Sequence, residues 1–173
     1  MDDNARKAAL PMILYGLHVM SAEDQDRRTP AGTLNWIAHP SFKPPLVAIG
    51  VKADSQIHDI TKTARYFALN VLGKGQQDAA YTFLKPDENE DQRISGEALN
   101  SGSTGTPVME NTPAFVECRL LTTVKEGEHS IFLGEVVETG VNQEPERRAD
   151  DVTLLLKDLG ENTFSGRCMD FIL

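Results

Sequence analysis

The chain has 173 residues, 40% of them apolar and 25% charged, which is typical of a soluble globular protein with a single domain over residues 1–173. Its net charge of −9 comes from 17 basic and 26 acidic residues. This charge argues against a nucleic-acid or anionic-membrane surface, but it leaves open a site for one buried mononucleotide phosphate. No apolar run approaches the ~20 residues of a membrane span and the first residues form no signal peptide, so we expect a cytoplasmic protein.

The N-terminal half predicts strands separated by short helices and turns. Ser55 is a good helix N-cap, and Ile57, Ile60 and Ala64 follow it at helical spacing on one face. The elements expected in this half are a helical turn over 2–10, strands over 12–21, 33–38 and 46–51, a helix from 54, a strand over 66–72 and a helix over 76–84.

The stretch 29–52, TPAGTLNWIAHPSFKPPLVAIGVK, predicts two strands joined by a stiff loop. The loop, HPSFKPP, has three prolines in seven residues, which fix the backbone and remove three N–H donors. Small polar groups and Trp36 would converge here, as at a pocket for a flat heteroaromatic ligand. The alternative is a rigid turn that packs Trp36 and Phe42 into the core, and the residues alone favour that alternative.

The C-terminal half begins with a long polar connection, 85–113, which contains the runs DENED and SGSTGTP. Its length suggests a functional excursion or a mobile segment, and its acidic run suggests a solvated face. Two antiparallel strands are expected over 114–126 and 130–140, with a last strand over 152–157. Cys118 and Cys168 match no metal or redox spacing. The order of elements favours a mainly β fold with inserted short helices, arranged as a closed antiparallel barrel with helical caps.

Three motifs occur in one order: TLNWIAHPSFKPPLVAIGVK at 33–52, YFALNVL at 66–72 and GEHSIFLGEVV at 127–137. They resemble the flavin reductase-like, FMN-binding split-barrel family, in which the last two motifs take the forms F-A-V-N-V-L and G-D-H-x-x-F-x-G-x-V. The likeness runs from about residue 14 to 140. It implies a split β-barrel that binds FMN, and a homodimer in which a second subunit closes the FMN site.

FMN needs partners for its phosphate and for its isoalloxazine. Lys52 and Ser55, at a strand end and a helix start, offer a cation, a hydroxyl and helix N–H groups to a phosphate. Plain N-capping is the alternative for Ser55, and a solvated strand end is the alternative for Lys52. The resemblance implies isoalloxazine contacts from Thr33, Leu34, Asn35, Trp36, His39, Pro40 and Ser41, with Asn35 where the family more often has Ser or Thr and His39 where it often has Gln.

None of the four histidines has the spacing of a metal site. His18 is expected in the core and His58 on a helix surface. His129 follows a turn between two strands, an exposed place for a functional group. The resemblance implies that this turn lies beside the flavin and the nicotinamide, which makes His129 the candidate catalytic residue, with Glu128 where the family has Asp.

Two functions of different class follow from these motifs. The first is an FMN-dependent oxidoreductase that takes hydride from NADH or NADPH and passes electrons to a flavin, a partner protein or a small molecule. No GxGxxG sequence is present, so the nicotinamide would stack on the flavin without a Rossmann domain. The second is an FMN-bearing electron carrier that docks to a redox partner protein without nicotinamide turnover. A flavin-free structural role is a third possibility. The sequence leaves open the final electron acceptor and the choice between NADH and NADPH.

Overall fold

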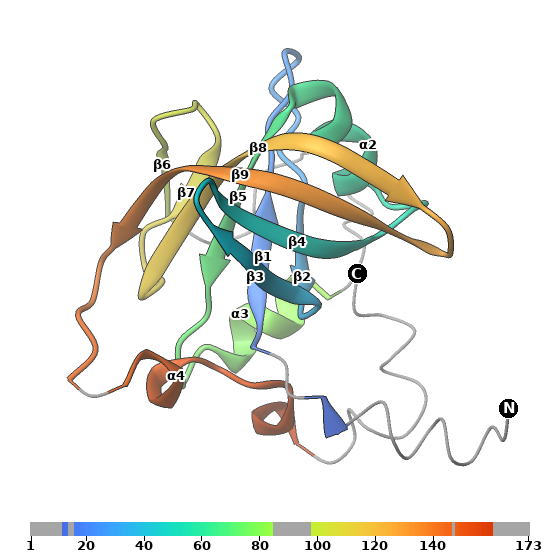
Figure 1. Cartoon of the computed structure of the whole chain (residues 1–173). Helices are drawn as coiled ribbons and strands as arrows, with labels where there is room; N and C mark the ends of the chain where they lie inside the picture. Colours follow the sequence, from blue (N-terminus) through green and yellow to red (C-terminus); the bar gives the residue numbers. More distant parts are fainter. Residues whose placement is uncertain (1–11, 14–15, 85–97, 147, 161–173) are drawn as a thin grey trace, which may run out of the picture.

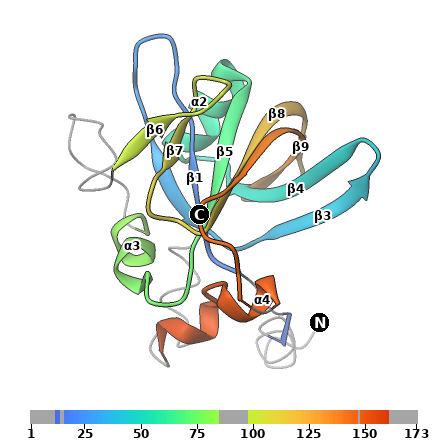
Figure 2. The ribbon, with the colours of Figure 1, turned by 90° about the vertical axis from the view of Figure 1, so that its left-hand side faces the viewer.

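A curled antiparallel sheet of seven strands, in the order β2-β1-β5-β8-β9-β4-β3, forms the body of the computed structural model, which describes residues 12–13, 16–84, 98–146 and 148–160 (Figure 1). A two-stranded hairpin, β6–β7, lies beside β5 (Figure 2). The strands are β1 (His18–Ser21), β2 (Ala31–Leu34), β3 (Ile37–Phe42), β4 (Pro45–Lys52), β5 (Tyr66–Val71), β6 (Leu99–Ser101), β7 (Pro107–Met109), β8 (Ala114–Lys125) and β9 (His129–Val141). The helices are α2 (Gln56–Ala64), α3 (Gln77–Thr82), α4 (Ala149–Val152) and the 3₁₀ helix η2 (Leu156–Leu159).

The sheet curls because its two edge strands, β2 and β3, are consecutive in the chain. A flat sheet of seven strands would hold its edges roughly 29 Å apart, at about 4.8 Å per strand. The step from Leu34 to Ile37 covers three residues, which span at most about 10 Å. The sheet therefore has to bend round on itself. Among the described residues no ladder of hydrogen bonds joins β2 to β3, so the predicted closure of the barrel is not confirmed.

Both edges are protected from further strand pairing. Thr33 donates its N–H to Phe83 O at 3.0 Å, which places α3 along the free edge of β2. On the other edge, the β3–β4 register shifts between Ala38 and Ser41, around Pro40. An edge strand tolerates a proline because that residue need not donate to a ladder.

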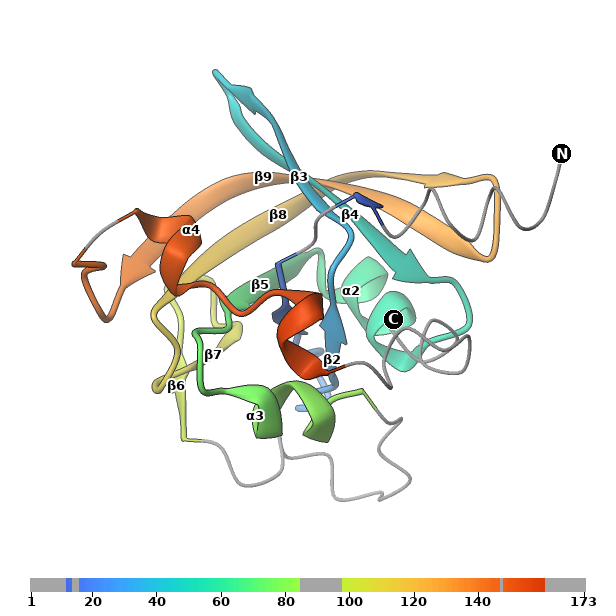
Figure 3. The ribbon, with the colours of Figure 1, turned by 90° about the horizontal axis from the view of Figure 1, so that it is seen from below.

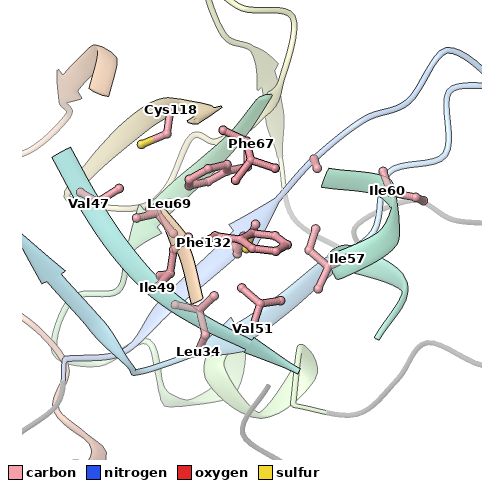
Figure 4. Close-up of a cluster of buried hydrophobic side chains, with 13 residues drawn as sticks. Leu34, Val47, Ile49, Val51, Ile57, Ile60, Phe67, Leu69, Cys118 and Phe132 are labelled. Atoms are coloured by element: carbon pink, nitrogen blue, oxygen red, sulfur yellow. The ribbon is translucent and has the colours of Figure 1, made fainter. Parts of the chain in front are cut away.

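Two apolar clusters lie on different sides of the sheet. The cluster enclosed by the curl includes Ile57 and Ile60, which α2 contributes, and Phe67 and Phe132 from the sheet (Figure 4). The other cluster packs α3 and the C-terminal segment against β1, with Leu17, Leu154 and Leu156 among its members. Each cluster buries side chains that are worth about 1.5–3 kcal/mol apiece when they leave water.

The structure confirms most of the expected strands and corrects three assignments. The strand expected over 33–38 is broken at Asn35–Trp36, where the chain passes from one sheet edge to the other. Four residues of the expected loop, 39–42, belong to β3. The strand expected over 152–157 is wrong: α4, η2 and isolated bridges at Thr153 and Leu155 occupy that segment. The helical turn expected over 2–10 and Cys168 lie outside the described residues.

The β3–β4 hairpin projects from the body of the molecule, whereas α2, α3 and α4 lie close against it (Figures 2 and 3). Phe42, near the tip of this hairpin, is 81% exposed. The alternative that packs Phe42 into the core is therefore wrong. Of the helices in the described part of the chain, none has the length and apolar character needed to cross a membrane.

Candidate functional site

Trp36 and His129 meet at one end of the sheet, where β3, β4 and β9 run side by side. Their rings make an edge-to-face contact with centroids 4.6 Å apart. Gly50 N–H donates to Trp36 O at 2.9 Å, and the indole lies on Gly50, where an added Cβ would come within 2.9 Å of Trp36 Cε3. His129 pairs with Lys52 in the β4–β9 register. The backbone therefore places an indole, an imidazole and a lysine at one corner.

The chain turns from β4 into α2 at the same corner. Ser55 Oγ donates to Lys52 O at 2.7 Å and accepts from His58 N–H at 3.3 Å, which confirms Ser55 as the N-cap. Ala53 N–H donates to Glu128 O at 2.9 Å and so joins this corner to the β8–β9 turn. The first N–H groups of a helix have no acceptor within the helix. They are the groups that can bind an anion here.

Two pairs of a cation and a carboxylate lie near the start of α2. Lys52 Nζ lies 3.8 Å from Asp54 Oδ1, and Arg28 Nε donates to Asp24 Oδ2 at 2.7 Å. A cavity of about 290 Å³ opens here, lined by Arg28, Asp54, Ser55, Gln56, Asp59, Ile60 and Thr63. A larger depression of about 580 Å³ lies elsewhere, between Lys74 and Asp151, and none of the predicted site residues lines it.

Two buried polar atoms near this corner have no hydrogen-bond partner in the structure: His129 Nε2 and Asn35 Oδ1. The His129 side chain is 15% exposed, and Asn35 is 3% exposed. An unsatisfied buried donor or acceptor costs about 1–3 kcal/mol. The N–H and carbonyl groups of an isoalloxazine are chemically suited to satisfy both atoms, so the residues present fit a flavin.

Thr33 and Leu34 are committed to other contacts. Thr33 Oγ1 donates to Ala80 O of α3 at 2.9 Å, and Leu34 is 1% exposed within the enclosed apolar cluster. The Thr33 N–H is also bonded to Phe83 O, and both residues pair with β1. In the stretch 33–36, Trp36 is the residue whose side chain contacts His129 at the corner, and Asn35 precedes it in the chain.

His39, Pro40 and Ser41 lie toward the tip of the projecting hairpin (Figure 3). At about 3.3 Å per residue, Ser41 is roughly 16 Å along β3 from Trp36. The ring centroids of His39 and Phe42 lie 4.6 Å apart, and Ser41 Oγ donates to Pro44 O at 2.7 Å. Within one protomer, the predicted residues therefore form two groups at opposite ends of β3.

His58 is the residue that the sequence analysis placed wrongly: it is 3% exposed, not on the helix surface. It lies about 100° round the helix from Ile57, at the edge of the apolar stripe, where helical spacing cannot decide burial. Arg28 was also missed, because it reaches the start of α2 from a loop distant in sequence. No local pattern signals either contact.

Two other titratable groups, His18 and Cys118, are uncharged near pH 7. Burial lowers the pKa of His18 to about 4, although the hydrogen bond to Gly16 O acts to raise this pKa. The ring is therefore neutral near pH 7. Burial and the neighbouring Glu117 charge raise the pKa of Cys118 to about 12, which keeps its thiol protonated. Among the described residues, no three His, Cys, Asp or Glu side chains gather as metal ligands would.

The family model of the flavin reductase like domain matches residues 12–160. A "Probable flavin reductase" of Rhizobium meliloti (strain 1021) is 28% identical over 135 residues, which cover 78% of this chain and 42% of that protein. The NADH:riboflavin 5′-phosphate oxidoreductase of Streptomyces pristinaespiralis is 27% identical over 145 residues, 79% of this chain and 81% of that protein.

Among solved structures, the Streptomyces globisporus C-1027 NADH:FAD oxidoreductase superposes with a TM-score of 0.77 at 25% identity, covering 91% of this chain and 90% of that one. The chain spans less than two thirds of the length of several curated relatives, including the Rhizobium meliloti protein. The family match nevertheless extends over most of the chain and over every strand described above. The chain therefore belongs to the flavin reductase like domain family.

Proposed function

We propose that this chain is a flavin reductase-like oxidoreductase that binds FMN and takes hydride from NADH or NADPH. The observation that carries the proposal is the corner where Trp36 and His129 are in ring contact beside Lys52 and the capped start of α2. The NADH in the names of two relatives supports NADH as the donor. A bound flavin supplies the hydride-accepting chemistry.

The residues of the chain bind and orient. Lys52 and the first N–H groups of α2 hold the phosphate, with Ser55 fixing the geometry of the helix start. Trp36 and Asn35 contact the ring system, and His129 Nε2 offers a hydrogen bond beside the reacting rings. Hydride transfer from a nicotinamide requires no proton exchange with a side chain, so His129 orients the reactants.

FMN is preferred over FAD on local grounds. The corner provides donors for one phosphate, and no glycine-rich loop follows it to hold an adenylate half. A relative named for riboflavin 5′-phosphate supports this choice, although another is named for FAD. We also propose that the curled sheet is a split barrel of the FMN-binding type within one domain over 1–173.

A homodimer would complete the site. Strands β8 and β9 expose apolar side chains that one protomer leaves uncovered, among them the cross-strand pair Val124 and Ile131 on one face, with Leu121, Val137 and Val141 also exposed. The hairpin that carries His39–Ser41 projects beyond its own protomer's corner (Figure 3). A second copy would cover the apolar face and bring a hairpin to the partner's site. Light scattering at micromolar concentration is expected to give twice the 19.0 kDa monomer mass, and a 19.0 kDa mass would contradict the dimer.

Two measurements test the proposed function. The purified protein is loaded with FMN and its absorption spectrum is recorded, with FAD loading as the comparison. The FMN-loaded protein is then mixed with NADH or NADPH without oxygen. Fast bleaching of the flavin band is expected, and a protein that binds neither flavin would refute the proposal.

A second candidate is an FMN-bearing electron carrier that docks to a redox protein. The net charge of −9 favours this candidate, because it would attract a basic partner. The anaerobic mixing experiment separates the two functions. An electron carrier binds FMN but shows no bleaching with either nicotinamide.

A further inference from the structure

Helix α2 carries a buried histidine that the proposed flavin contacts do not use. The His58 side chain is 4% exposed and its ring lies 5.1 Å from that of Phe132, with 31° between the planes. His58 Nε2 lies 3.0 Å from Ser130 Oγ, and Nδ1 lies 3.1 Å from Asp59 Oδ1. Both ring nitrogens are therefore hydrogen-bonded, one to the sheet and one to the helix.

The Asp59 carboxylate fixes the direction of the first bond. An ionised carboxylate only accepts, so Nδ1–H donates to Asp59. In the neutral imidazole Nε2 is then the acceptor of a hydrogen bond from the Ser130 hydroxyl. The order serine, histidine, aspartate is that of a hydrolytic triad, but Ser130 has no exposed surface that a substrate could reach. The bonds therefore connect elements of the fold and activate no nucleophile.

The two ends of this connection are the two halves of the proposed site. His58 N–H donates to Ser55 Oγ at 3.3 Å, at the start of α2 where the phosphate would bind. Ser130 follows His129 directly on β9 and pairs with Val51 of β4. Among the described residues within the bounds of α2, His58 makes the one side-chain hydrogen bond to the sheet. The caps add two more, from Ser55 Oγ to Lys52 O and from Arg65 Nη2 to Leu120 O. At this corner the backbone bond from Ala53 to Glu128 also joins the start of α2 to the β8–β9 turn.

We propose that His58 is a positioning residue that holds the start of α2 in place against β9. The bond to Ser130 fixes the first turn of α2, where the phosphate would bind, relative to β9 and the ring-binding end at His129. Lys52 is held beside His129 by the β4–β9 register. This inference rests on the proposed function. Losing the bond frees the helix start to shift, which weakens flavin binding without removing any flavin contact.

Two substitutions at one position test this role. His58→Gln places an amide near the site of Nε2 and keeps a bond to Ser130, whereas His58→Asn places it near Nδ1 and keeps a bond to Asp59. Each variant loses one of the two hydrogen bonds: Gln loses the bond to Asp59, whose side chain is 75% exposed, and Asn loses the bond to the buried Ser130 hydroxyl. We expect the FMN dissociation constant to rise about tenfold in His58→Asn and to stay within about threefold of wild type in His58→Gln.

Ser130→Ala removes the same bond from the sheet side and should also weaken FMN about tenfold. If the two residues act through one bond, the double variant His58→Asn/Ser130→Ala binds FMN no more weakly than either single variant. Trp36, the only tryptophan, reports binding through its fluorescence. In the flavin-free variants, hydrogen exchange should quicken at the first turn of α2 while the β8–β9 amides remain protected.

The outcomes separate this inference from the function on which it rests. If wild type binds no flavin, both fail. If wild type binds FMN and the Asn and Gln variants bind it equally well, or the losses in the double variant multiply, the positioning role is refuted and the proposed function stands. Should His58→Asn not fold, Ser130→Ala decides, and an unchanged dissociation constant overturns the role.

Discussion

Two buried polar centres in this protein differ in whether their hydrogen bonds are satisfied within the chain. Glu117 of β8 has no exposed surface, and its carboxylate accepts four hydrogen bonds from the loop between β6 and β7. The donors are Ser103 N–H at 2.9 Å, Ser103 Oγ at 2.7 Å, Thr104 N–H at 3.1 Å and Thr104 Oγ1 at 2.6 Å. At the Trp36–His129 corner, His129 Nε2 and Asn35 Oδ1 are buried and have no hydrogen-bond partner among the described residues.

The difference distinguishes a structural polar group from one available to a ligand. A folded chain satisfies buried polar groups wherever it can, and Glu117 is saturated. Gly102 makes this possible, because a Cβ at that position would lie 2.1 Å from Glu117 Oε1. The corner retains unsatisfied atoms at a cost that a bound flavin would remove. Of the polar connection expected over 85–113, residues 85–97 lie outside the described residues, and the rest includes the β6–β7 hairpin, whose loop is fixed on the Glu117 carboxylate.

The largest effect is expected from removing the charge of Glu117, whose carboxylate accepts four hydrogen bonds. Glu117→Gln turns an N–H₂ group toward N–H and O–H donors and loses charge-assisted bonds worth about 1.5–3 kcal/mol each. The free energy of unfolding, measured in urea, should fall by about 3 kcal/mol. Glu138→Gln is the matched control, since Glu138 is exposed directly opposite Glu117 on β9, and it should change stability by less than about 0.5 kcal/mol.

The pH dependence gives a second check on the same residue. Burial acts to raise the pKa of Glu117, but the hydrogen bonds from Thr104 and Ser103 outweigh it and hold this pKa below the ordinary value of 4.5. The stabilisation is therefore complete above pH 4.5 and is lost as the pH falls through the lower folded-state pKa. Wild type and Glu117→Gln should converge in stability on acidification. A constant difference down to the acid limit would contradict this account.

The next largest effect is expected at the Trp36–His129 corner. His129→Ala should leave FMN bound but slow its reduction by NAD(P)H about 10²-fold, because small misplacements of reacting rings have effects of that order. Stopped-flow reduction of the FMN-loaded variant measures this rate, with Glu126→Gln in the same turn as the control. An unaltered rate would remove His129 from the site. It would also leave its unpartnered nitrogen without a functional reason.

The smallest effect is expected at the anion-binding end. Lys52→Glu combined with Ser55→Ala should weaken FMN about tenfold or more, because it reverses one charge and removes the helix cap. The cap contributes about 1 kcal/mol to stability, so the fold should survive. Titration of Trp36 fluorescence with FMN tests the pair, and riboflavin, which lacks the phosphate, should lose little affinity. Equal losses for both ligands would place the phosphate elsewhere.

Local features of the fold were predictable and distant contacts were not. Ser55 could be identified as a cap because its partners lie within three residues of it. The long β8–β9 hairpin was evident from alternation around one turn. The strand expected over 152–157 did not form. Thr153 and Leu155 make only isolated bridges, with Gly73 and Gly16, and the apolar residues of the segment fill a cluster that includes α3.

The candidate site shows the same limit. The family motifs indicated Trp36 and His129, and the register of β4 with β9 brings them together. His58 was misplaced because its burial depends on Ser130, 72 positions further along the chain. The separation of His39–Ser41 from Trp36 likewise depends on how far β3 extends.

The pairing of strands that are distant in the sequence also constrains how the chain can fold. The pairs β1–β2, β3–β4 and β8–β9 are local hairpins. The pairs β1–β5 and β4–β9 instead join distant parts of the chain, with Val19 opposite Asn70 and Val47 opposite Gly134. Chains dominated by such distant pairings fold slowly, on a scale of about milliseconds to seconds, because loop entropy is lost before the contacts form. The proposed site lies across β4 and β9. It cannot exist in any folding intermediate in which those two strands have not yet met.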